Sequence, residues 1–231
     1  MILASICMRG GSKGVPKKNQ KQLLGKPLMQ YTIECAKKSK LVNDIVISSE
    51  CKSILRIASN FFSKEKIYQR DLKLATDSSS KWDVFRNLVL SYEKRTSKKV
   101  KYLVDLDVTV PLRLPSHIDE CVKIMSNKNI EVVITGYEPE RNPYFNMMEV
   151  KNDGTAVIVK ESSNPIVCRQ QAPKVYSLTP AVYVIKRDAL FNYEHWSKAI
   201  CKIHPIPREL AIDIDTEFDF KLVEYIMKYE K

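Results

Sequence analysis

The chain has 231 residues, of which 44% are hydrophobic, so one large domain or two small ones with a full hydrophobic core are expected, without disulfides or metals being required for stability. No apolar run approaches the roughly 20 residues of a membrane-spanning helix, and Arg9 interrupts the apolar start before it reaches the length of a signal peptide, so we expect no membrane partner. The formal net charge of +11 favours polyanionic ligands, and six basic residues precede Glu34, the first acidic residue.

Short apolar runs alternate with amphipathic stretches through the first 136 residues. In chain order the expected elements are strand Ile2–Met8, helix Leu28–Lys38, strand Asp44–Ser48, helix Cys51–Phe62, strand Lys66–Tyr68, helix Ser80–Tyr92, strand Tyr102–Leu106, helix Ser116–Met125 and strand Glu131–Gly136. Strand–helix alternation at this spacing predicts an α/β fold with a doubly wound, mostly parallel sheet.

The pattern changes after Gly136. Residues 137–178, here called the arm, are rich in Pro and Asn and contain two short alternating segments, Phe145–Val150 and Thr155–Lys160. Such segments favour an antiparallel excursion over another strand–helix–strand unit. The sheet is expected to resume at Ala181–Ile185, and a helix is expected over 216–231. A single domain, 1–231, with the arm inserted in it is the most economical interpretation.

The glycine loop, residues 9–19, follows the first expected strand and contains three of the six glycines of the chain, Gly10, Gly11 and Gly14. Glycine permits positive φ and lets backbone N–H groups approach a ligand closely. The basic side chains of the loop are Arg9, Lys13, Lys17 and Lys18. Because ligands bind outside the carboxyl ends of strands in such sheets, we expect a phosphate site here rather than a glycine turn beside a solvated basic patch. RGGSKG fits neither the Walker pattern nor GxGxxG, which argues against a P-loop ATPase and a dehydrogenase.

The glycine loop also resembles a known family. RGGSKGVPKKN (9–19), followed by LGKPL (24–28), is similar to the N-terminal signature of acylneuraminate cytidylyltransferases, the CMP-sialic acid synthetases. Further matches follow in the family's order: IVISS (45–49), RDLKLATDSSS (70–80), PLR (111–113), RQQ (169–171) and DIDTEFD (213–219). The resemblance covers essentially the whole chain. It implies a Rossmann-like nucleotidyltransferase fold in which the arm serves in dimerisation.

The resemblance implies a reaction in which the anomeric hydroxyl of an acidic nonulosonic sugar attacks the α-phosphorus of CTP and pyrophosphate leaves. Arg9 and Lys18 would be catalytic, with Lys18 nearest the α-phosphate, because negative charge is redistributed onto the bridging oxygen. The implied CTP-binding residues are Arg9, Gly10, Gly11, Lys13, Lys18, Asn19, Arg70, Ser79 and Ser80. For Arg70, a surface ion pair with Asp71 or Asp77 is the alternative.

Asp213 and Asp215 are two carboxylates one residue apart. On a strand this spacing puts both on one face, while Ile212 and Ile214 point into the core. Paired carboxylates suit Mg²⁺, which keeps several waters and adds substrate phosphates, so both residues are expected to be catalytic metal ligands. The alternative is that Asp215 caps the following helix.

Three departures from the family pattern lie near the expected acceptor pocket. Asp107 stands where Gln is usual, Lys81 where a small residue is common, and Ser177–Pro180 where many members have Asn-Gly. An ionised Asp107 offers only acceptors, so it would contact N–H or O–H donors of the sugar, or else add a metal ligand. With Asp107, the runs at 141–146 and 169–177 resemble the legionaminate-type synthetases. A modest preference for legionaminic acid over N-acetylneuraminic acid is therefore expected.

In the homodimer that the resemblance implies, the arm reaches over the neighbour's pocket. Arg169 would bind the sugar carboxylate there in bidentate fashion, with Gln170 as a further sugar contact. Tyr144 and Phe145 would pack against the methyl-ended side chain of the sugar, or they would fill the core of the arm itself.

Several alternatives stay open at this point. The acceptor could be N-acetylneuraminic or pseudaminic acid, or the substrate could be 3-deoxy-manno-octulosonate or a sugar 1-phosphate. A basic RNA-binding protein is the alternative from another class, but no stacking aromatic precedes Tyr31, so no nucleic-acid partner is expected. A non-catalytic dimeric scaffold would not need Lys18, Asp213 and Asp215. The six cysteines lack CxxC spacing and indicate free thiols in the cytoplasm.

Overall fold

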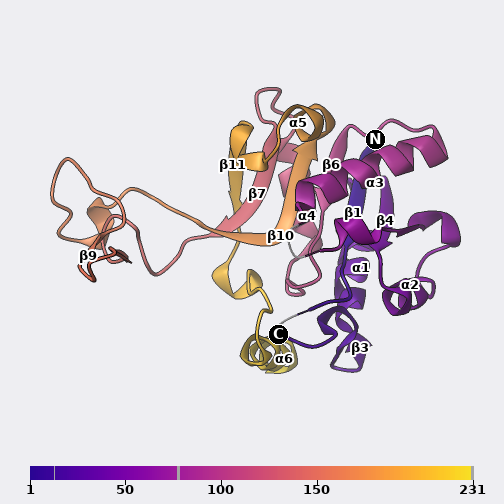
Figure 1. Ribbon diagram of the computed structural model, residues 1–231, viewed down its shortest axis with the longest axis horizontal. Coiled ribbons are helices and arrows are strands. Elements are labelled where there is room, and N and C mark those ends of the chain that lie inside the picture. Colours follow the sequence, from indigo (N-terminus) through magenta and orange to yellow (C-terminus); the bar gives the residue numbers. More distant parts are fainter. Residues whose placement is uncertain (13, 77–78, 230–231) are drawn as a thin grey trace.

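The apolar strand segments form a central seven-stranded sheet in the computed structural model, which describes residues 1–12, 14–76 and 79–229 (Figure 1). Its strands are β1 (Ile2–Cys7), β4 (Asp44–Ser49), β5 (Ile67–Gln69), β6 (Tyr102–Asp105), β7 (Val132–Tyr137), β10 (Ser177–Lys186) and β11 (Cys201–Pro205). Their spatial order is β11-β7-β10-β6-β1-β4-β5. Neighbouring strands are parallel except at β10, which is antiparallel to both β6 and β7. The predicted mostly parallel sheet is confirmed.

Helices cover both faces of the sheet, because the buried strands present apolar side chains alternately to each side. On β1, Ala4 and Ile6 join one core cluster and Leu3 joins the other. The first cluster is packed by α1 (Leu28–Lys38), α2 (Lys52–Ala58), α4 (Pro115–Ile124) and α6 (Glu217–Tyr229). The second is packed by α3 (Lys81–Thr96) and α5 (Arg187–Asn192). This is the doubly wound arrangement that the strand–helix alternation predicts.

Short elements complete the described chain. A small hairpin pairs β2 (Gln22–Leu23) with β3 (Lys26–Pro27). Single 3₁₀ turns lie at Lys18–Gln20, Lys64–Lys66, Leu72–Leu74, Arg169–Gln171, Trp196–Lys198 and Arg208–Leu210. No helix among the described residues is both long and apolar enough to cross a bilayer.

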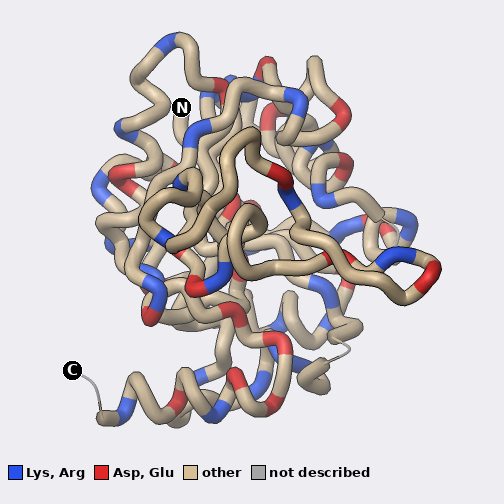
Figure 2. The backbone as a smooth tube through the Cα atoms, turned by 90° about the vertical axis from the view of Figure 1, so that its left-hand side faces the viewer, with Lys and Arg blue, Asp and Glu red and all other residues tan. Residues whose placement is uncertain are grey.

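The arm leaves the sheet after β7 and returns into β10, and Figure 1 shows it extending away from the rest of the chain. Its only strands among the described residues, β8 (Met148–Val150) and β9 (Ala156–Ile158), form an antiparallel pair, as the alternating segments predict. Viewed from the side of the arm, Lys and Arg positions along the backbone are interspersed with Asp and Glu positions (Figure 2). The excess of positive charge is therefore not concentrated in one stretch of backbone in this view.

Several elements and one conformation depart from the sequence prediction. The sequence does not predict α5, β11 or the β2–β3 hairpin, and the segment at 213–215 is not the strand that was expected. In β11 only Ile203 and His204 are even partly buried, so this edge strand lacks the apolar alternation that marks a strand in sequence. The segment at 213–215 instead runs as a loop beside the loop that follows β6.

Candidate active site

A pocket of about 400 Å³ lies at the carboxyl ends of β1, β5 and β6. The direction of strand order reverses between β1 and β6, which is where ligands bind in open α/β sheets. The predicted site residues that line this main pocket are Arg9, Lys18, Asn19, Arg70, Ser79, Asp107, Asp213 and Asp215. The fold thus brings together residues separated by up to 206 positions in sequence (215 minus 9).

The glycines of the loop provide close approach rather than positive φ. Among the described residues, positive φ in this loop occurs at Lys17 (53°) and at none of its glycines. A Cβ at Gly14 would lie only 1.9 Å from the backbone oxygen of Asp215, and one at Gly10 would lie 3.0 Å from the Cβ of Cys51. Gly11 has open space around its Cα. Gly14 therefore lets the loop pack directly on the carboxylate segment, residues 213–215.

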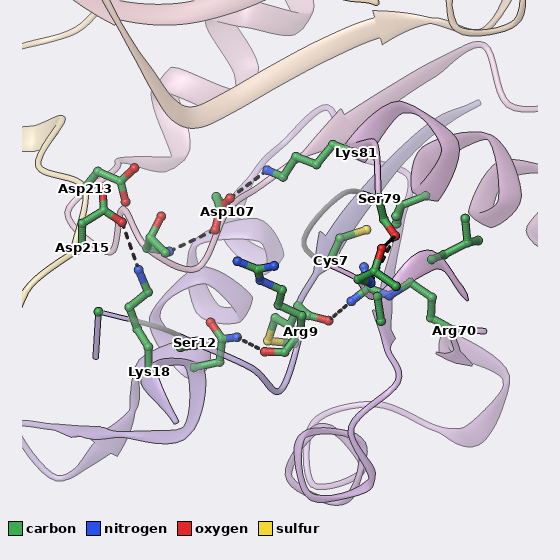
Figure 3. Close-up of a pocket in the computed structure, with 18 residues that line it drawn as sticks. Cys7, Arg9, Ser12, Lys18, Arg70, Ser79, Lys81, Asp107, Asp213 and Asp215 are labelled. Atoms are coloured by element: carbon green, nitrogen blue, oxygen red, sulfur yellow. Dashed lines mark hydrogen bonds and ion pairs between the residues drawn. The ribbon is translucent and has the colours of Figure 1, made fainter. Parts of the chain in front are cut away.

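Lys18 joins the glycine loop to the same segment. Its ammonium donates to the backbone oxygen of Ile214 and lies 3.3 Å from Asp215 Oδ1, and its side chain is only 12% exposed (Figure 3). Asn19 is buried and donates from Nδ2 to the backbone oxygen of Arg9 at 2.9 Å, which fixes the start of the loop. In Figure 3 the Arg9 side chain reaches toward the centre of the pocket. Lys13 lies outside the described residues.

Arg70 is a buried wall of the pocket, and among the described residues its ion-pair partner is Glu50 and not Asp71, while Asp77 lies outside the described residues. Its Nη2 donates to the backbone oxygen of Met8 and to Glu50 Oε2 at 2.7 Å, while its buried Nε has no hydrogen-bond partner. The other oxygen of Glu50 accepts from the Gly10 N–H at 2.6 Å. Burial opposes ionisation of Glu50, but Arg70 and the Gly10 N–H outweigh it and lower its pKa. Glu50, which sequence reasoning missed, thus connects the glycine loop to Arg70.

The carboxylate segment keeps the predicted alternation without being a strand. Ile214 is fully buried and its N–H donates to the backbone oxygen of Thr109 at 2.9 Å, whereas Asp213 and Asp215 line the pocket. Burial raises the pKa of Asp213 despite a hydrogen bond from Thr109, and its Oδ1 is buried without a hydrogen-bond partner. An isolated buried carboxylate oxygen is costly unless it binds a cation or donor.

Thr216 and Asp219, which follow Asp215 in the chain, cap the N-terminus of α6. The Thr216 N–H donates to Asp219 Oδ2 at 2.7 Å, and the Asp219 N–H donates to Thr216 Oγ1 at 3.2 Å. This reciprocal pair is a capping box, so Asp215 is not the cap and its carboxylate faces the pocket. Figure 3 shows Asp213 and Asp215 side by side, with Lys18 pointing toward Asp215.

The donor set fits Mg²⁺. No group of three or more His, Cys, Asp or Glu residues within the described ranges is arranged for a metal. Mg²⁺, however, is usually held by one or two carboxylates together with waters and substrate phosphates. The unpartnered Asp213 oxygen and the exposed Asp215 carboxylate, beside a loop suited to phosphates, match that requirement.

Asp107 is ion-paired to Lys81, so two of the three departures from the family pattern are in direct contact. The Lys81 ammonium lies 2.7 Å from Asp107 Oδ2 (Figure 3). It also lies 3.2 Å from Asp105 Oδ2. Burial opposes the charge on each side of the pair, but the attraction raises the pKa of Lys81 and lowers that of Asp107, so both are ionised. Below them the buried Arg113 donates to the Asp107 backbone oxygen and to Thr32 Oγ1, which supports the loop after β6.

A second cavity of about 350 Å³ adjoins the main pocket at Lys81. Its other lining residues are Ser80, Trp82, Phe85, Asp105, Tyr183, His195 and Trp196. Ser80 also caps α3, since its hydroxyl accepts from the Trp82 N–H at 3.1 Å. Sequence reasoning missed this cavity because its aromatic residues come from α3, β10 and the 3₁₀ turn at 196–198, and read as core residues.

The remaining predicted contacts lie elsewhere. Gly10 and Gly11 belong to the loop beside the main pocket but do not line it. Tyr144, Phe145, Arg169 and Gln170 lie in the arm. Arg169 donates to the backbone oxygen of Pro139 and, with Gln170, lines a separate hollow of about 220 Å³. Tyr144 and Phe145 are partly exposed, and Lys160 Nζ lies 5.2 Å above the Tyr144 ring. None of these four residues lines this chain's own main pocket, and their predicted role in a neighbour's pocket stays a prediction.

Comparisons with known proteins identify relatives that match the chain over nearly its full length. Post-translational flagellin modification protein B of Campylobacter coli is 35% identical over 98% of this chain and 95% of its own. CMP-N,N'-diacetyllegionaminic acid synthase of Campylobacter jejuni subsp. jejuni serotype O:2 is 34% identical over 98% of this chain and 94% of its own. The solved structure of CMP:2-keto-3-deoxy-manno-octonic acid synthetase complexed with CTP shares the fold, with a TM-score of 0.69 at 17% identity, covering 100% of this chain and 99% of that one.

The family is settled by the match along the chain. A family model described as cytidylyltransferase matches residues 3–230, and the resemblance seen in the sequence motifs is thereby confirmed. With two relatives above 30% identity over nearly their full lengths, the chain belongs to the cytidylyltransferase family.

Proposed function

We propose that this chain transfers CMP from CTP to the anomeric hydroxyl of a nonulosonic acid and releases pyrophosphate. One observation carries the proposal: the glycine loop with its cations packs directly on the carboxylate segment, so that Lys18 and Asp215 meet at one point of the main pocket. Such a junction suits a phosphate chain whose α-phosphorus lies between a cationic loop and a cation-binding pair of carboxylates. The acceptor class is supported by the relative that is named as a CMP-N,N'-diacetyllegionaminic acid synthase.

The chain's own residues would act mainly by positioning and charge neutralisation. Arg9, Lys13 and Lys18 would hold the triphosphate, with backbone N–H groups of Gly10 and Gly11 beside them. Lys18 would lie nearest the α-phosphate. There its charge would stabilise the transition state more than the ground state, because negative charge moves onto the bridging oxygen as pyrophosphate departs.

The nucleoside would lie on the side of Arg70. The buried, unpartnered Nε of Arg70 is a donor suited to an oxygen of cytosine. Asn19 and Ser79 line the main pocket with Arg70, and Ser80 lines the adjoining second cavity. At the carboxylate segment, Asp213 and Asp215 would hold Mg²⁺. A bound Mg²⁺ would offset phosphate charge and lower the pKa of the attacking hydroxyl.

The acceptor would occupy the second cavity, with its anomeric centre facing the main pocket past Asp107 and Lys81. The aromatic rings of Trp82, Phe85 and Trp196 suit the apolar parts of an acylated sugar. A legionaminic-type acid is the proposed preference, with roughly 10–200-fold higher kcat/KM than N-acetylneuraminic acid, since apolar discrimination is worth only a few kcal/mol.

The proposed assembly is a homodimer. The arm exposes large apolar side chains, such as Met148 (58%), Val150 (70%) and Val167 (75%), which a second copy would cover. Arg169 and Gln170 would then contact the sugar in the neighbour's pocket, with Tyr144 and Phe145 near its side chain. The proposed compartment is the cytoplasm, in keeping with six free thiols.

A substrate panel tests the proposed function. Pyrophosphate release should require CTP, a nonulosonic acid and Mg²⁺ together, and ATP, GTP or UTP should not replace CTP. The acceptors to compare are legionaminic, pseudaminic and N-acetylneuraminic acids and 3-deoxy-manno-octulosonate. Comparable turnover with ATP, or none with any acidic sugar, would contradict the proposal. Salt-sensitive RNA affinity without pyrophosphate release would favour an RNA-binding function instead.

A further inference from the structure

Lys81 occupies a position that no other described residue shares. It is the first residue of α3, and it alone lines both the main pocket and the second cavity. It is also the only Lys or Arg among the described residues of the second cavity. A single cation therefore stands at the boundary between the place of the nucleotide and the place of the acceptor.

Two carboxylates fix the position of the Lys81 ammonium. Asp107 lies 2.7 Å away on one side and Asp105 lies 3.2 Å away on the other. Asp105 is fixed in turn by Ser5, whose hydroxyl donates to its Oδ1 at 3.0 Å, and Asp107 by the Thr109 N–H at 3.3 Å. A lysine on a flexible stem is thus converted into a positioned charge, which reduces the conformational entropy that ligand binding would cost.

The ammonium keeps capacity for a ligand. It has three N–H donors, two of which the Asp105 and Asp107 carboxylates engage, and the Lys81 side chain is 50% exposed although both partners are more deeply buried. The N-terminus of α3, where Lys81 lies, adds partial positive charge from the helix dipole. The third donor is therefore available to an anionic group at the boundary.

The chemistry of the acceptor supplies such a group at the right place. A nonulosonic acid carries its carboxylate on the same carbon as the anomeric hydroxyl that attacks phosphorus. An acceptor lying in the second cavity with that hydroxyl toward the main pocket would bring the carboxylate to the boundary between them. Resting on the proposed function, we infer that Lys81 binds the acceptor carboxylate within the same chain and so orients the anomeric hydroxyl, with Asp105 and Asp107 as its positioning residues.

The experiment compares an acid with its neutral analogue. Steady-state kcat/KM is measured for the preferred nonulosonic acid and for its 1-carboxamide, in the wild-type protein and in Lys81→Met. The wild type should prefer the acid, and in Lys81→Met the acid-to-amide ratio should fall by roughly 10–100-fold, the worth of a charge-assisted hydrogen bond. The KM for CTP should change by less than about threefold, because uniform nucleotide binding is untouched. If Lys81 had a purely structural role, Lys81→Met would lower kcat/KM for the acid and for the carboxamide by the same factor and leave their ratio unchanged.

Two further variants serve as controls. Lys94→Met removes an exposed lysine from the same helix and should leave the ratio at the wild-type value. Arg169→Ala tests the rival cation from the arm. An acid-to-amide ratio that falls in Arg169→Ala and not in Lys81→Met would overturn the inference, as would a wild type that does not distinguish the two substrates.

A charge-balanced variant controls for loss of folding. Lys81→Met leaves two carboxylates without their cation, so Lys81→Met combined with Asp107→Asn is measured alongside it. A wild-type ratio in this double variant would overturn the inference. Turnover of the acid by the wild-type protein tests the proposed function separately. A failure of the inference about Lys81 is therefore distinguishable from a failure of the proposed function.

Discussion

Replacing Gly14 by alanine should separate the glycine loop from the carboxylate segment. The added Cβ would lie 1.9 Å from the backbone oxygen of Asp215, whereas ordinary contact begins at 3.4 Å, so the two backbones must move apart by about 1.5 Å. Neither atom belongs to a flexible side chain. A displacement of about 1 Å at a reacting centre costs roughly 100-fold in rate, and overpacking costs about 1–3 kcal/mol of stability.

The matched control is Gly11→Ala, where a Cβ meets nothing within 4 Å and the backbone N–H proposed to lie beside the triphosphate is kept. Turnover is followed as pyrophosphate release at saturating CTP and acceptor, and Tm is followed by calorimetry. Gly14→Ala should lose roughly 100-fold in kcat and about 2–4 °C in Tm per kcal/mol of lost stability, while Gly11→Ala stays near wild type in both. Equal activity of the two variants would refute the idea that loop and carboxylate segment must touch.

Four further predictions test other parts of the site and the fold. Asp215→Ala should lower turnover roughly 10²–10⁴-fold, and EDTA should stop the wild type until Mg²⁺ is restored; a metal-independent wild type would be inconsistent with the assigned ligands. Lys18→Met should lower kcat by roughly 100-fold and CTP affinity, measured by calorimetry, much less; the reverse pattern would make Lys18 a binding residue only. Arg169→Ala and Asp215→Ala subunits, each of low activity alone, should regain activity when mixed, and no recovery after confirmed subunit exchange would place Arg169 outside the neighbour's site. Burial opposes ionisation of Glu93, but hydrogen bonds from Arg187 and Val100 outweigh it and lower the pKa of Glu93 below 4.5. The ionised Glu93 therefore stabilises the fold by about 1–2 kcal/mol at pH 7. This stabilisation is lost as pH falls through the folded-state pKa. The unfolding free energies of wild type and Glu93→Gln in urea should therefore differ by a constant amount from pH 7 down to about pH 5 and converge as the pH is lowered below 4.5, and a difference that persists below that pH would contradict this.

The core of the fold was predictable because burial imposes a pattern on the sequence. Strand β1 is buried on both faces and reads as an apolar run interrupted only by Ser5, and α1 begins and ends where its amphipathic stretch does. Edge elements carry no such pattern. Strand β11 is mostly exposed and α5 has only six residues, so neither leaves a periodic signal of useful length.

The candidate site was predictable where its chemistry lies in short motifs. The glycine loop and the carboxylate pair each carry a spacing that points to phosphate and metal. The contacts between motifs were not predictable, because they join residues far apart in sequence: Glu50 to Arg70 and Gly10, and Lys81 to Asp107. Gly14 shows the same limit, since the sequence suggests backbone freedom and the structure shows a close approach to Asp215.

The most direct measurement of the central claim is the product balance of a single reaction. The purified chain is mixed with CTP, Mg²⁺ and legionaminic acid, and the reaction is followed by phosphorus NMR and mass spectrometry. The predicted result is one CMP-sugar phosphodiester formed for each pyrophosphate released and each CTP consumed. Formation of free CMP or orthophosphate without a CMP-sugar, or no consumption of CTP, would contradict it.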